Sequence, residues 1–190
     1  LQRVFNRHSI IDKLFILNFT WYQRKRNYRA LLHKIHQAQD SIWITSAYFV
    51  PDQRILTALR KAAKRKVDVR LLLTHVSDVP ITTLVAATFY GLLYKSGVKI
   101  YEYMPSMLHA KSLIIDEWFC VGSTNLNSRS LFYDYEIDVN IQSEAAKTLL
   151  KRQFLQDLQE SRQINWGDIK HQAFLKRVLG HILLSIRNII

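Results

Sequence analysis

The stretch that decides the fold is Leu108-His109-Ala110-Lys111-Ser112-Leu113-Ile114-Ile115-Asp116, which continues after Glu117 as Trp118-Phe119-Cys120-Val121-Gly122-Ser123-Thr124-Asn125. Two apolar runs around a short polar break predict a β-hairpin. Because side chains alternate along a strand, His109 and Lys111 point to the same face. The stretch therefore predicts an imidazole beside an ammonium group that is too costly to bury without an anionic partner.

The length of the hairpin loop decides which side chains meet His109 and Lys111. A two-residue loop would place His109 opposite Thr124 and turn Ser123 and Asn125 away from it. A three-residue loop, residues 116–118, would pair Lys111 with Ser123 and His109 with Asn125 on one face. We expect the three-residue loop, because a base or nucleophile, a fixed cation and two neutral donors suit phosphoryl chemistry.

The composition indicates an ordered globular protein with an anionic partner. The 190 residues hold 27 Lys and Arg against 15 Asp and Glu, a net charge of +12. This imbalance favours nucleic acid, acidic lipid or a phosphorylated substrate over an evenly solvated basic surface. One cysteine, Cys120, excludes an internal disulfide, suits a reducing compartment, and is expected to be a small buried hydrophobe. We find no signal-peptide pattern and no apolar run that could span a membrane, and since the chain starts at Leu1 we expect a piece of a longer protein.

The rest of the chain alternates between predicted strands and helices. Residues 1–20 are ambiguous between a helix and a strand followed by a helix. Strands are expected at 42–50, 67–74, 98–103 and 134–142, and helices at 21–39, 53–65 with Asp52 as N-cap, 80–95 ending near Gly97, and 144–160 with Ser143 as cap. This order predicts an α/β fold, an α/β/α sandwich with a mixed sheet.

The last part of the chain changes in character. From Trp166, apolar residues at helical spacing alternate with Lys170, Lys176, Arg177 and Arg187. We therefore expect two parts, a lobe at 1–162 and a basic amphipathic helix at 163–190. Packing on the lobe or on a missing half is the alternative, and we favour binding to a membrane surface.

The hairpin also resembles a known signature. His109-x-Lys111-x4-Asp116 followed by Gly122-Ser123-x-Asn125 is similar to the HKD motif of the phospholipase D superfamily. The segments 46–52, 62–69 and 97–103 flank it in the order of bacterial cardiolipin synthase-like members, and the resemblance covers roughly residues 24–142.

Several site residues follow from this resemblance. Glu136 stands where the superfamily has the carboxylate that orients the imidazole, with Asp134 and Asp138 as competitors. Arg129 follows the Asn and is expected to bind a substrate phosphate or to pin its loop. Asp116 belongs to the signature, but an extended strand places it about 16 Å from Lys111. We therefore expect a structural role for it, in local backbone hydrogen bonds of the turn.

Two other features bear on function, Gly122 in the hairpin and the pair His33 and His36 in the helix expected at 21–39. Gly122 is expected to let the backbone approach a ligand closely. His33 and His36 could share a metal, but because they lack a third ligand at useful spacing we expect surface residues.

The resemblance implies a mechanism that needs two motifs. One His becomes a phosphohistidine, the other protonates the leaving alcohol and later activates the acceptor, and the Lys and Asn side chains hold the phosphoryl oxygens without a metal or other cofactor. This chain has one motif, so the second comes from the same longer chain or from a homodimer mate. We expect the C-terminal half, with His109 as acid and base.

The expected function is phosphatidyl transfer or phosphodiester hydrolysis on an anionic phospholipid such as phosphatidylglycerol. The expected location of the protein is the cytoplasmic membrane, where it would be peripheral or anchored through a missing segment. The alternatives are a homodimeric nuclease or phosphodiesterase, for which nucleic acid would be the less favoured partner, and a catalytically silent half-domain.

Overall fold

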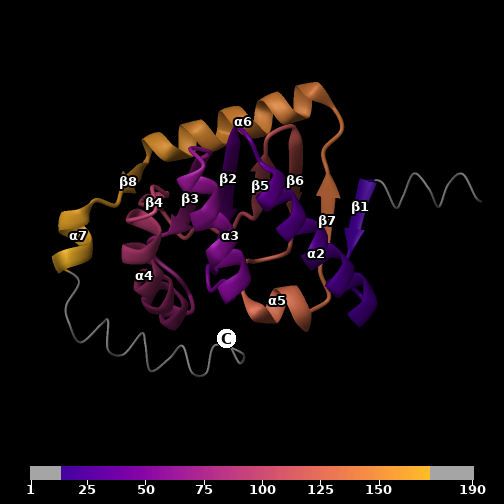
Figure 1. The fold of residues 1–190 in the computed structure, drawn as a ribbon, viewed down its shortest axis with the longest axis horizontal. Helices are drawn as coiled ribbons and strands as arrows, with labels where there is room; N and C mark the ends of the chain where they lie inside the picture. Colours follow the sequence, from indigo (N-terminus) through magenta and orange to yellow (C-terminus); the bar gives the residue numbers. More distant parts are fainter. Residues whose placement is uncertain (1–13, 172–190) are drawn as a thin grey trace, which may run out of the picture.

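The computed structural model describes residues 14–171, which form a mixed β-sheet with helices on both faces (Figure 1). Three of its strands run parallel, β2 (Ser41–Ser46), β3 (Asp68–Thr74) and β4 (Lys99–Tyr103). The sheet continues through β5 (Ser112–Ile115), β6 (Trp118–Gly122) and β7 (Ile137–Asn140), each antiparallel to the strand before it in the sheet. The short strands β1 (Phe15–Leu17) and β8 (Ser161–Gln163) are the outermost strands of the sheet, whose order is β1-β7-β6-β5-β2-β3-β4-β8.

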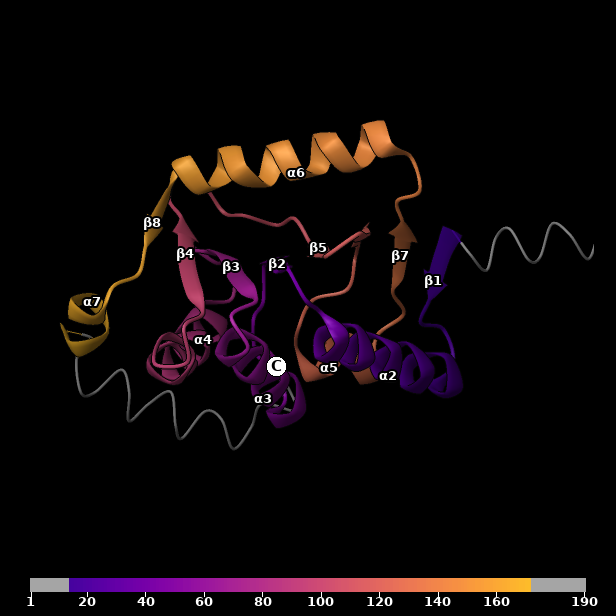
Figure 2. The same ribbon diagram turned by 45° about the horizontal axis from the view of Figure 1, so that its top comes forward.

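The helices form the two outer layers. Figure 2 shows α6 (Glu144–Gln159) along one face of the sheet and α2 (Trp21–Gln37), α3 (Gln53–Lys64), α4 (Pro80–Tyr94) and α5 (Ser128–Phe132) along the other. This arrangement confirms the predicted α/β/α sandwich with a mixed sheet.

The sheet is buried on both faces because successive strand residues point in opposite directions. Ile44 and Leu71 belong to the core that faces α2, α3 and α4, whereas Trp43 and Leu72 belong to the core that faces α6. The Trp43 ring stacks on Phe154 of α6, with 5.2 Å between the ring centroids. Two separate cores therefore hold the sheet between its helices.

Side-chain caps fix where the helices begin. Asp52 accepts the backbone N–H of Ile55 at 2.9 Å, and Ser143 caps α6, both as predicted. Thr20 and Gln23 form a capping box at the start of α2, which the sequence reading did not identify.

Strand β1, followed by α2, agrees with one of the two alternatives left open for residues 1–20. Among the described residues, α5 and β8 were not predicted, and the strand expected at 134–142 is shortened to β7. The polar side of this strand is the buried one. Glu136 and Asp138 are each 8% exposed, whereas Tyr135 is 78% and Ile137 42% exposed. The carboxylates here therefore need partners, and the apolar side chains face outward.

The predicted register of the hairpin is wrong. Ile115 pairs with Trp118, so the loop consists of the two residues Asp116 and Glu117. Asp116 has a φ of +48°, which suits tight two-residue hairpin turns and which Asp tolerates better than most residues. The predicted register pairs Lys111 with Ser123. In the structure, the backbone N–H of Gly122 donates to the carbonyl oxygen of Lys111 at 3.2 Å.

Residues near the C-terminal end of the described chain pack on the lobe. Helix α7 (Trp166–His171) follows β8, the Trp166 ring stacks on Tyr94 with 5.9 Å between centroids, and Ile169 is buried. The predicted basic amphipathic helix lies mostly outside the described residues, and the division at residue 162 stays a prediction. Between residues 14 and 171, no helix is both long and apolar enough to span a bilayer.

Candidate active site

Most of the predicted site residues, with the exception of Asp116, lie at one edge of the sheet. The parallel strands β2 and β3 end there, as does β6, and the antiparallel β5 and β7 begin there. His109 and Lys111 directly precede β5, Asn125 follows β6, and Glu136 precedes β7. We call this the carboxyl edge of the sheet, and it is the usual place for ligands in open α/β sheets.

Tyr48 links His109 to Asn125. The exposed His109 ring meets the Tyr48 ring edge to face, with 5.9 Å between centroids and 80° between planes. The backbone N–H of Tyr48 donates to Oδ1 of the buried Asn125 at 3.2 Å. The Tyr48 hydroxyl donates to Oδ1 of Asp78 at 2.7 Å, and desolvation together with this carboxylate raises the pKa of Tyr48 to about 12.

Asp78 is a carboxylate of the same cluster. The hydrogen bond from the Tyr48 hydroxyl holds the pKa of Asp78 below its ordinary value, and the charge of His109 acts in the same direction. Asp78 thus stays ionised beside the imidazole.

Lys111 lies among these groups and is partly buried. Its Nζ donates to the backbone carbonyl of His109 at 2.7 Å. Burial lowers the pKa of Lys111, while the charges of Glu136 and Asp78 oppose this shift. Two carboxylates therefore favour the cationic form of Lys111.

The structure separates the three candidate carboxylates by their partners. Glu136 is buried, accepts a hydrogen bond from the Ser130 hydroxyl at 2.5 Å, and is the one of the three whose charge acts on Lys111. Asp134 instead pairs with Arg129 at 3.2 Å, an exposed contact that pins the loop after α5. Asp138 belongs to a contact between strands, described below.

Ser123 is not turned toward Lys111 as expected. Its Oγ accepts the backbone N–H of Ile137 at 3.0 Å, and its own N–H donates to the Ile137 carbonyl at 3.0 Å. The cause is the two-residue hairpin loop, which shifts every pairing on β6 by one position. Ser123 thus joins β6 to β7, and its expected pairing with Lys111 is wrong, as is the direct pairing of His109 with Asn125.

Gly122 makes room for a neighbouring strand. A Cβ at this position would lie 2.1 Å from Oδ1 of Asp138 and 2.5 Å from the carbonyl oxygen of Ile137. Oδ2 of Asp138 accepts the Thr124 hydroxyl at 2.6 Å, and its Oδ1 accepts the backbone N–H of Thr124 at 3.1 Å. Burial raises the pKa of Asp138, and these two hydrogen bonds oppose the rise. The close approach at Gly122 is thus to β7, and the expected approach of a ligand there stays a prediction.

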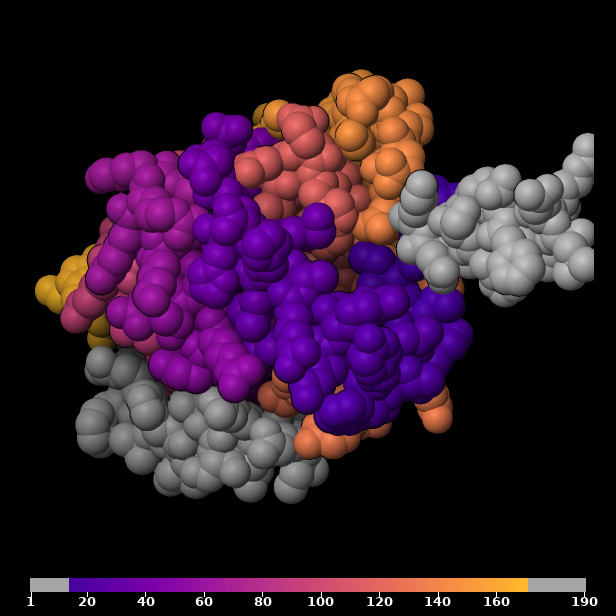
Figure 3. All heavy atoms as spheres, turned by 45° about the vertical axis from the view of Figure 1, so that its right-hand side comes forward, coloured from indigo at the N-terminus to yellow at the C-terminus, as the bar shows by residue number. Residues whose placement is uncertain are grey.

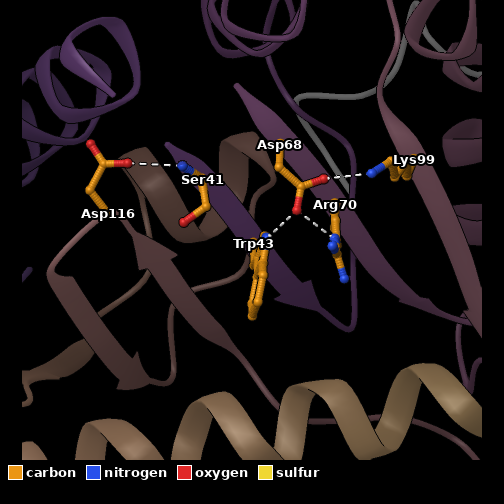
Figure 4. A network of polar contacts seen from close by, with 6 residues as sticks. All are labelled: Ser41, Trp43, Asp68, Arg70, Lys99 and Asp116. Carbon is orange, nitrogen blue, oxygen red and sulfur yellow. Dashed lines mark hydrogen bonds and ion pairs between the residues drawn. The ribbon is translucent and has the colours of Figure 1, made fainter. Parts of the chain in front are cut away.

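Asp116 lies at the opposite edge of the sheet, as Figure 4 shows beside Ser41. Its Oδ1 accepts the backbone N–H groups of Asp40 at 3.0 Å and Ser41 at 2.9 Å, and its Oδ2 accepts that of Gln39 at 3.0 Å. Partial burial alone would raise the pKa of Asp116, but these three donors outweigh it and lower the pKa. The partners are backbone groups as predicted, but they come from residues 39–41, where β2 begins, instead of from the turn itself.

Sequence reading missed Tyr48, Asp78 and Ser130. Tyr48 falls in the segment 46–52 that carries part of the family resemblance, which was the one available signal. Asp78 lies in the turn between β3 and α4, far from the hairpin in sequence, so no spacing marked it.

Among residues 14–171, no three His, Cys, Asp or Glu side chains gather in a way that could hold a metal ion. His33 and His36 are both exposed on α2. Cys120 is 2% exposed, and burial raises the pKa of its thiol to about 12.

Comparison with known sequences identifies relatives over most of this chain. The family described as "Cardiolipin synthase, PLD-like domain" matches residues 31–158. The cardiolipin synthase of Halalkalibacterium halodurans is 35% identical over 154 residues, which cover 80% of this chain and 31% of that protein. That of Geobacillus sp. (strain WCH70) is 36% identical over 163 residues, covering 85% of this chain and 32% of the relative. The chain thus spans about a third of the length of the curated relatives it matches.

Solved structures share the fold at lower identity. Nuc from Salmonella typhimurium, a phospholipase D family member, has a TM-score of 0.60 at 20% identity, covering 73% of this chain and 90% of that one. The phosphatidylserine synthase of Haemophilus influenzae has a TM-score of 0.69 at 12% identity, covering 93% of this chain and 47% of that one. With the family match over residues 31–158, the chain belongs to the cardiolipin synthase, phospholipase D-like domain family.

Proposed function

We propose that this chain carries one catalytic half of a phospholipase D-type enzyme that transfers or hydrolyses the phosphatidyl group of an anionic phospholipid such as phosphatidylglycerol. The observation that carries the proposal is the cluster of His109, Lys111 and Asn125 at the carboxyl edge of a domain that matches cardiolipin synthases. The net charge of +12 favours a negatively charged substrate surface.

The proposed reaction has two steps. A His of the second half attacks phosphorus, the bond to the leaving alcohol breaks, and His109 gives that alcohol its proton. His109 then takes a proton from the acceptor, an alcohol or water, whose oxygen attacks phosphorus. The phosphorus–nitrogen bond of the phosphohistidine breaks, and the His of the second half is freed. The second half comes from another part of the longer protein or from a second copy of the chain.

Lys111 and Asn125 would hold the phosphoryl oxygens during both steps. Because Oδ1 of Asn125 accepts the N–H of Tyr48, its amide N–H groups are the ones presented to an oxygen anion. Fixed donors and cations of this kind stabilise the charge that develops on the oxygens, so the proposal requires no metal. Glu136 supports the cationic form of Lys111 and is proposed to orient the catalytic imidazole of this site.

The first experiment replaces His109 by Ala in the complete protein and measures turnover of phosphatidylglycerol vesicles. Removal of a general acid and base should lower the rate about 10²- to 10⁴-fold. His33→Ala is the matched control, since His33 is exposed on α2. Turnover by His109→Ala at the rate of His33→Ala would refute the proposal.

A second substrate tests the role of His109 as acid. Phosphatidyl-p-nitrophenol releases an alcohol that needs no proton, so the His109→Ala protein should give a burst of one p-nitrophenol per site and then stop. The absence of a burst in this variant, with a burst in the wild type, would assign the attack on phosphorus to His109.

Two other functions remain as alternatives. A homodimeric phosphodiesterase acting on nucleic acid is supported by the basic charge and by the fold shared with Nuc along 90% of that chain. Degradation of DNA without turnover of phosphatidylglycerol would favour it. A silent half-domain would turn over neither substrate.

We propose a peripheral or anchored position at the cytoplasmic membrane.

A further inference from the structure

A cavity of about 440 Å³ lies between α2 and the β5–β6–β7 part of the sheet, and the proposed chemistry accounts for Lys111 at one end of it but not for the rest. Figure 3 shows this side of the molecule, with α2 and the β5–β6 hairpin next to each other. Its volume lies within the range of about 300–1,000 Å³ that is typical of small-molecule sites.

The cavity leads away from the candidate active site. Lys111 lines it at the carboxyl edge, and Trp118 lines it where β6 begins beside the hairpin loop. Since Trp118 pairs with Ile115, four residues from Lys111, the cavity follows β5 for about 13 Å. It is therefore long in the direction of the strand and starts at a proposed phosphate-binding residue.

Apolar side chains form much of the wall. Leu31 of α2 faces Leu113 of β5, Cys120 of β6 and Ile16 of β1 across the cavity, with Leu126 near the carboxyl edge. Burying a ligand's apolar surface here would stabilise it by about 25 cal/mol per Å².

Three pairs of polar side chains in the wall are bonded to one another. They pair as Thr124 with Asp138 at 2.6 Å, Asn27 with Asn18 at 2.8 Å, and Trp118 with Asn140 at 2.8 Å. These three pairs need no polar ligand, whereas Arg24, which also lines the cavity, has a buried Nε without a hydrogen-bond partner.

One cationic group, Lys111, stands at the end next to the catalytic residues, while Arg24, Arg26 and Lys34 line the cavity from α2. Lys111 has three N–H donors, of which one is bound to the carbonyl of His109. An anion at Lys111 joined to an apolar chain along β5 would match both the charge and the lining. A phospholipid has these two parts in this order.

We propose that this cavity holds one acyl chain of a phospholipid whose phosphate lies at Lys111. This inference rests on the proposed function, because it takes the phosphodiester of the substrate to be at the carboxyl edge. It extends that function by making the length of the acyl chain, as well as the headgroup, a determinant of substrate choice.

Tryptophan fluorescence provides the test, because bromine quenches an indole ring only on contact. Trp21, Trp43, Trp118 and Trp166 are all among the described residues, and Trp118 is the one of them that lines the cavity. The full chain is titrated with monomeric lysophosphatidylglycerol whose acyl chain carries bromine. Saturable quenching is expected, and it should be reversed by the unbrominated lipid but not by inorganic phosphate.

Two pairs of variants assign the quenching to the cavity. Trp118→Phe should lose it, whereas Trp21→Phe, which removes an exposed ring on α2, should keep it. Ala30→Phe places a ring into the cavity from the exposed surface of α2 and should weaken binding about tenfold, as expected from displacing two methylenes. Ala145→Phe makes the same change at an exposed position of α6 and should leave binding unchanged.

The outcomes separate this inference from the proposed function. Quenching that persists in Trp118→Phe, or binding unchanged in Ala30→Phe, would overturn the acyl site even in a protein that turns over phospholipid. Because the measurement needs no turnover, Trp118-dependent quenching in a protein inactive on phospholipids would support the acyl site and reject the proposed reaction.

Discussion

Asp116 is the residue for which the structure makes its sharpest prediction, because a catalytic signature contains it and yet its contacts are structural. Its carboxylate accepts three backbone N–H groups at 2.9–3.0 Å, at the edge of the sheet opposite to His109. Asp116→Ala removes all three acceptors and leaves alanine at a φ of +48°. Asp116→Asn keeps one acceptor oxygen and a residue that tolerates this backbone conformation.

The expected magnitude follows from the exposure of the three donors. The N–H of Ser41 is partly buried, so losing its acceptor costs about 1–3 kcal/mol, whereas water replaces the acceptor at the two exposed donors for about 0.5 kcal/mol each. Alanine at positive φ adds about 1 kcal/mol. Asp116→Ala should therefore lower the free energy of unfolding by about 3–5 kcal/mol, and Asp116→Asn by about 1–2 kcal/mol.

Urea unfolding followed by circular dichroism measures these differences, with Glu117→Ala in the same loop as a control expected within about 0.5 kcal/mol of wild type. The pKa of Asp116 is lowered in the folded protein, so its stabilising contribution is present above the unfolded pKa of about 4 and is lost as the pH falls below it. The gap between wild type and Asp116→Asn should thus be full at pH 7 and shrink toward pH 3.

The refuting result is also specific. If Asp116→Asn unfolds at the wild-type urea concentration but loses turnover as His109→Ala does, the carboxylate acts in catalysis and our structural assignment is wrong. If both Asp116 variants are as stable as wild type, the three hydrogen bonds do not contribute.

Further predictions concern both edges of the sheet. Gly122→Ala should separate β6 from β7, lowering stability by about 1–3 kcal/mol together with turnover, whereas Gly91→Ala, whose Cβ would be 3.6 Å from its nearest neighbour, should stabilise α4 by up to about 1 kcal/mol in urea unfolding. Tyr48→Phe should keep the ring contact to His109 and lower kcat less than tenfold, while Tyr48→Ala should lower it further; equal rates in steady-state kinetics would count against a positioning role. Asp68→Asn should cost about 1–3 kcal/mol with kcat unchanged, because Asp68 accepts bonds from Trp43, Arg70 and Lys99 away from the site (Figure 4); thermal unfolding and turnover of one preparation check both.

Local signals in the sequence were sufficient for most of the fold. Asp52 and Ser143 mark helix starts because a cap acts within three residues of its own position. The alternation of Trp43 and Ile44 into opposite cores is likewise a property of neighbouring residues. The α/β order of elements followed from such short-range patterns.

The hairpin register could not be derived in this way. Trp118, Phe119, Cys120 and Val121 are apolar on both faces of β6, so their pattern fits a two- or a three-residue loop equally well. The deciding contacts are those of Asp116 with residues 39–41, which are more than 70 positions away.

Long-range contacts also decided which carboxylate belongs to the candidate site. Glu136 and Asp138 lie on the same side of one strand, so spacing alone could not distinguish them. The partner of each, Ser130 for Glu136 and Thr124 for Asp138, is known only once the chain has folded. Tyr48 and Asp78 enter the site for the same reason.

The two ends of the strands carry residues with different roles, and this affects which substitutions such a domain can tolerate. Hydrogen bonds to Asp68 and Asp116 stabilise the edge where the parallel strands begin. The residues proposed to contact substrate lie in loops at the other edge. Substitutions in those loops leave the stabilised edge intact, so new substrate preferences can be sampled at small cost to folding. In a directed-evolution library, diversity placed at residues 75–79 and 133–135 should therefore yield more folded variants than equal diversity at residues 39–41 and 116–117.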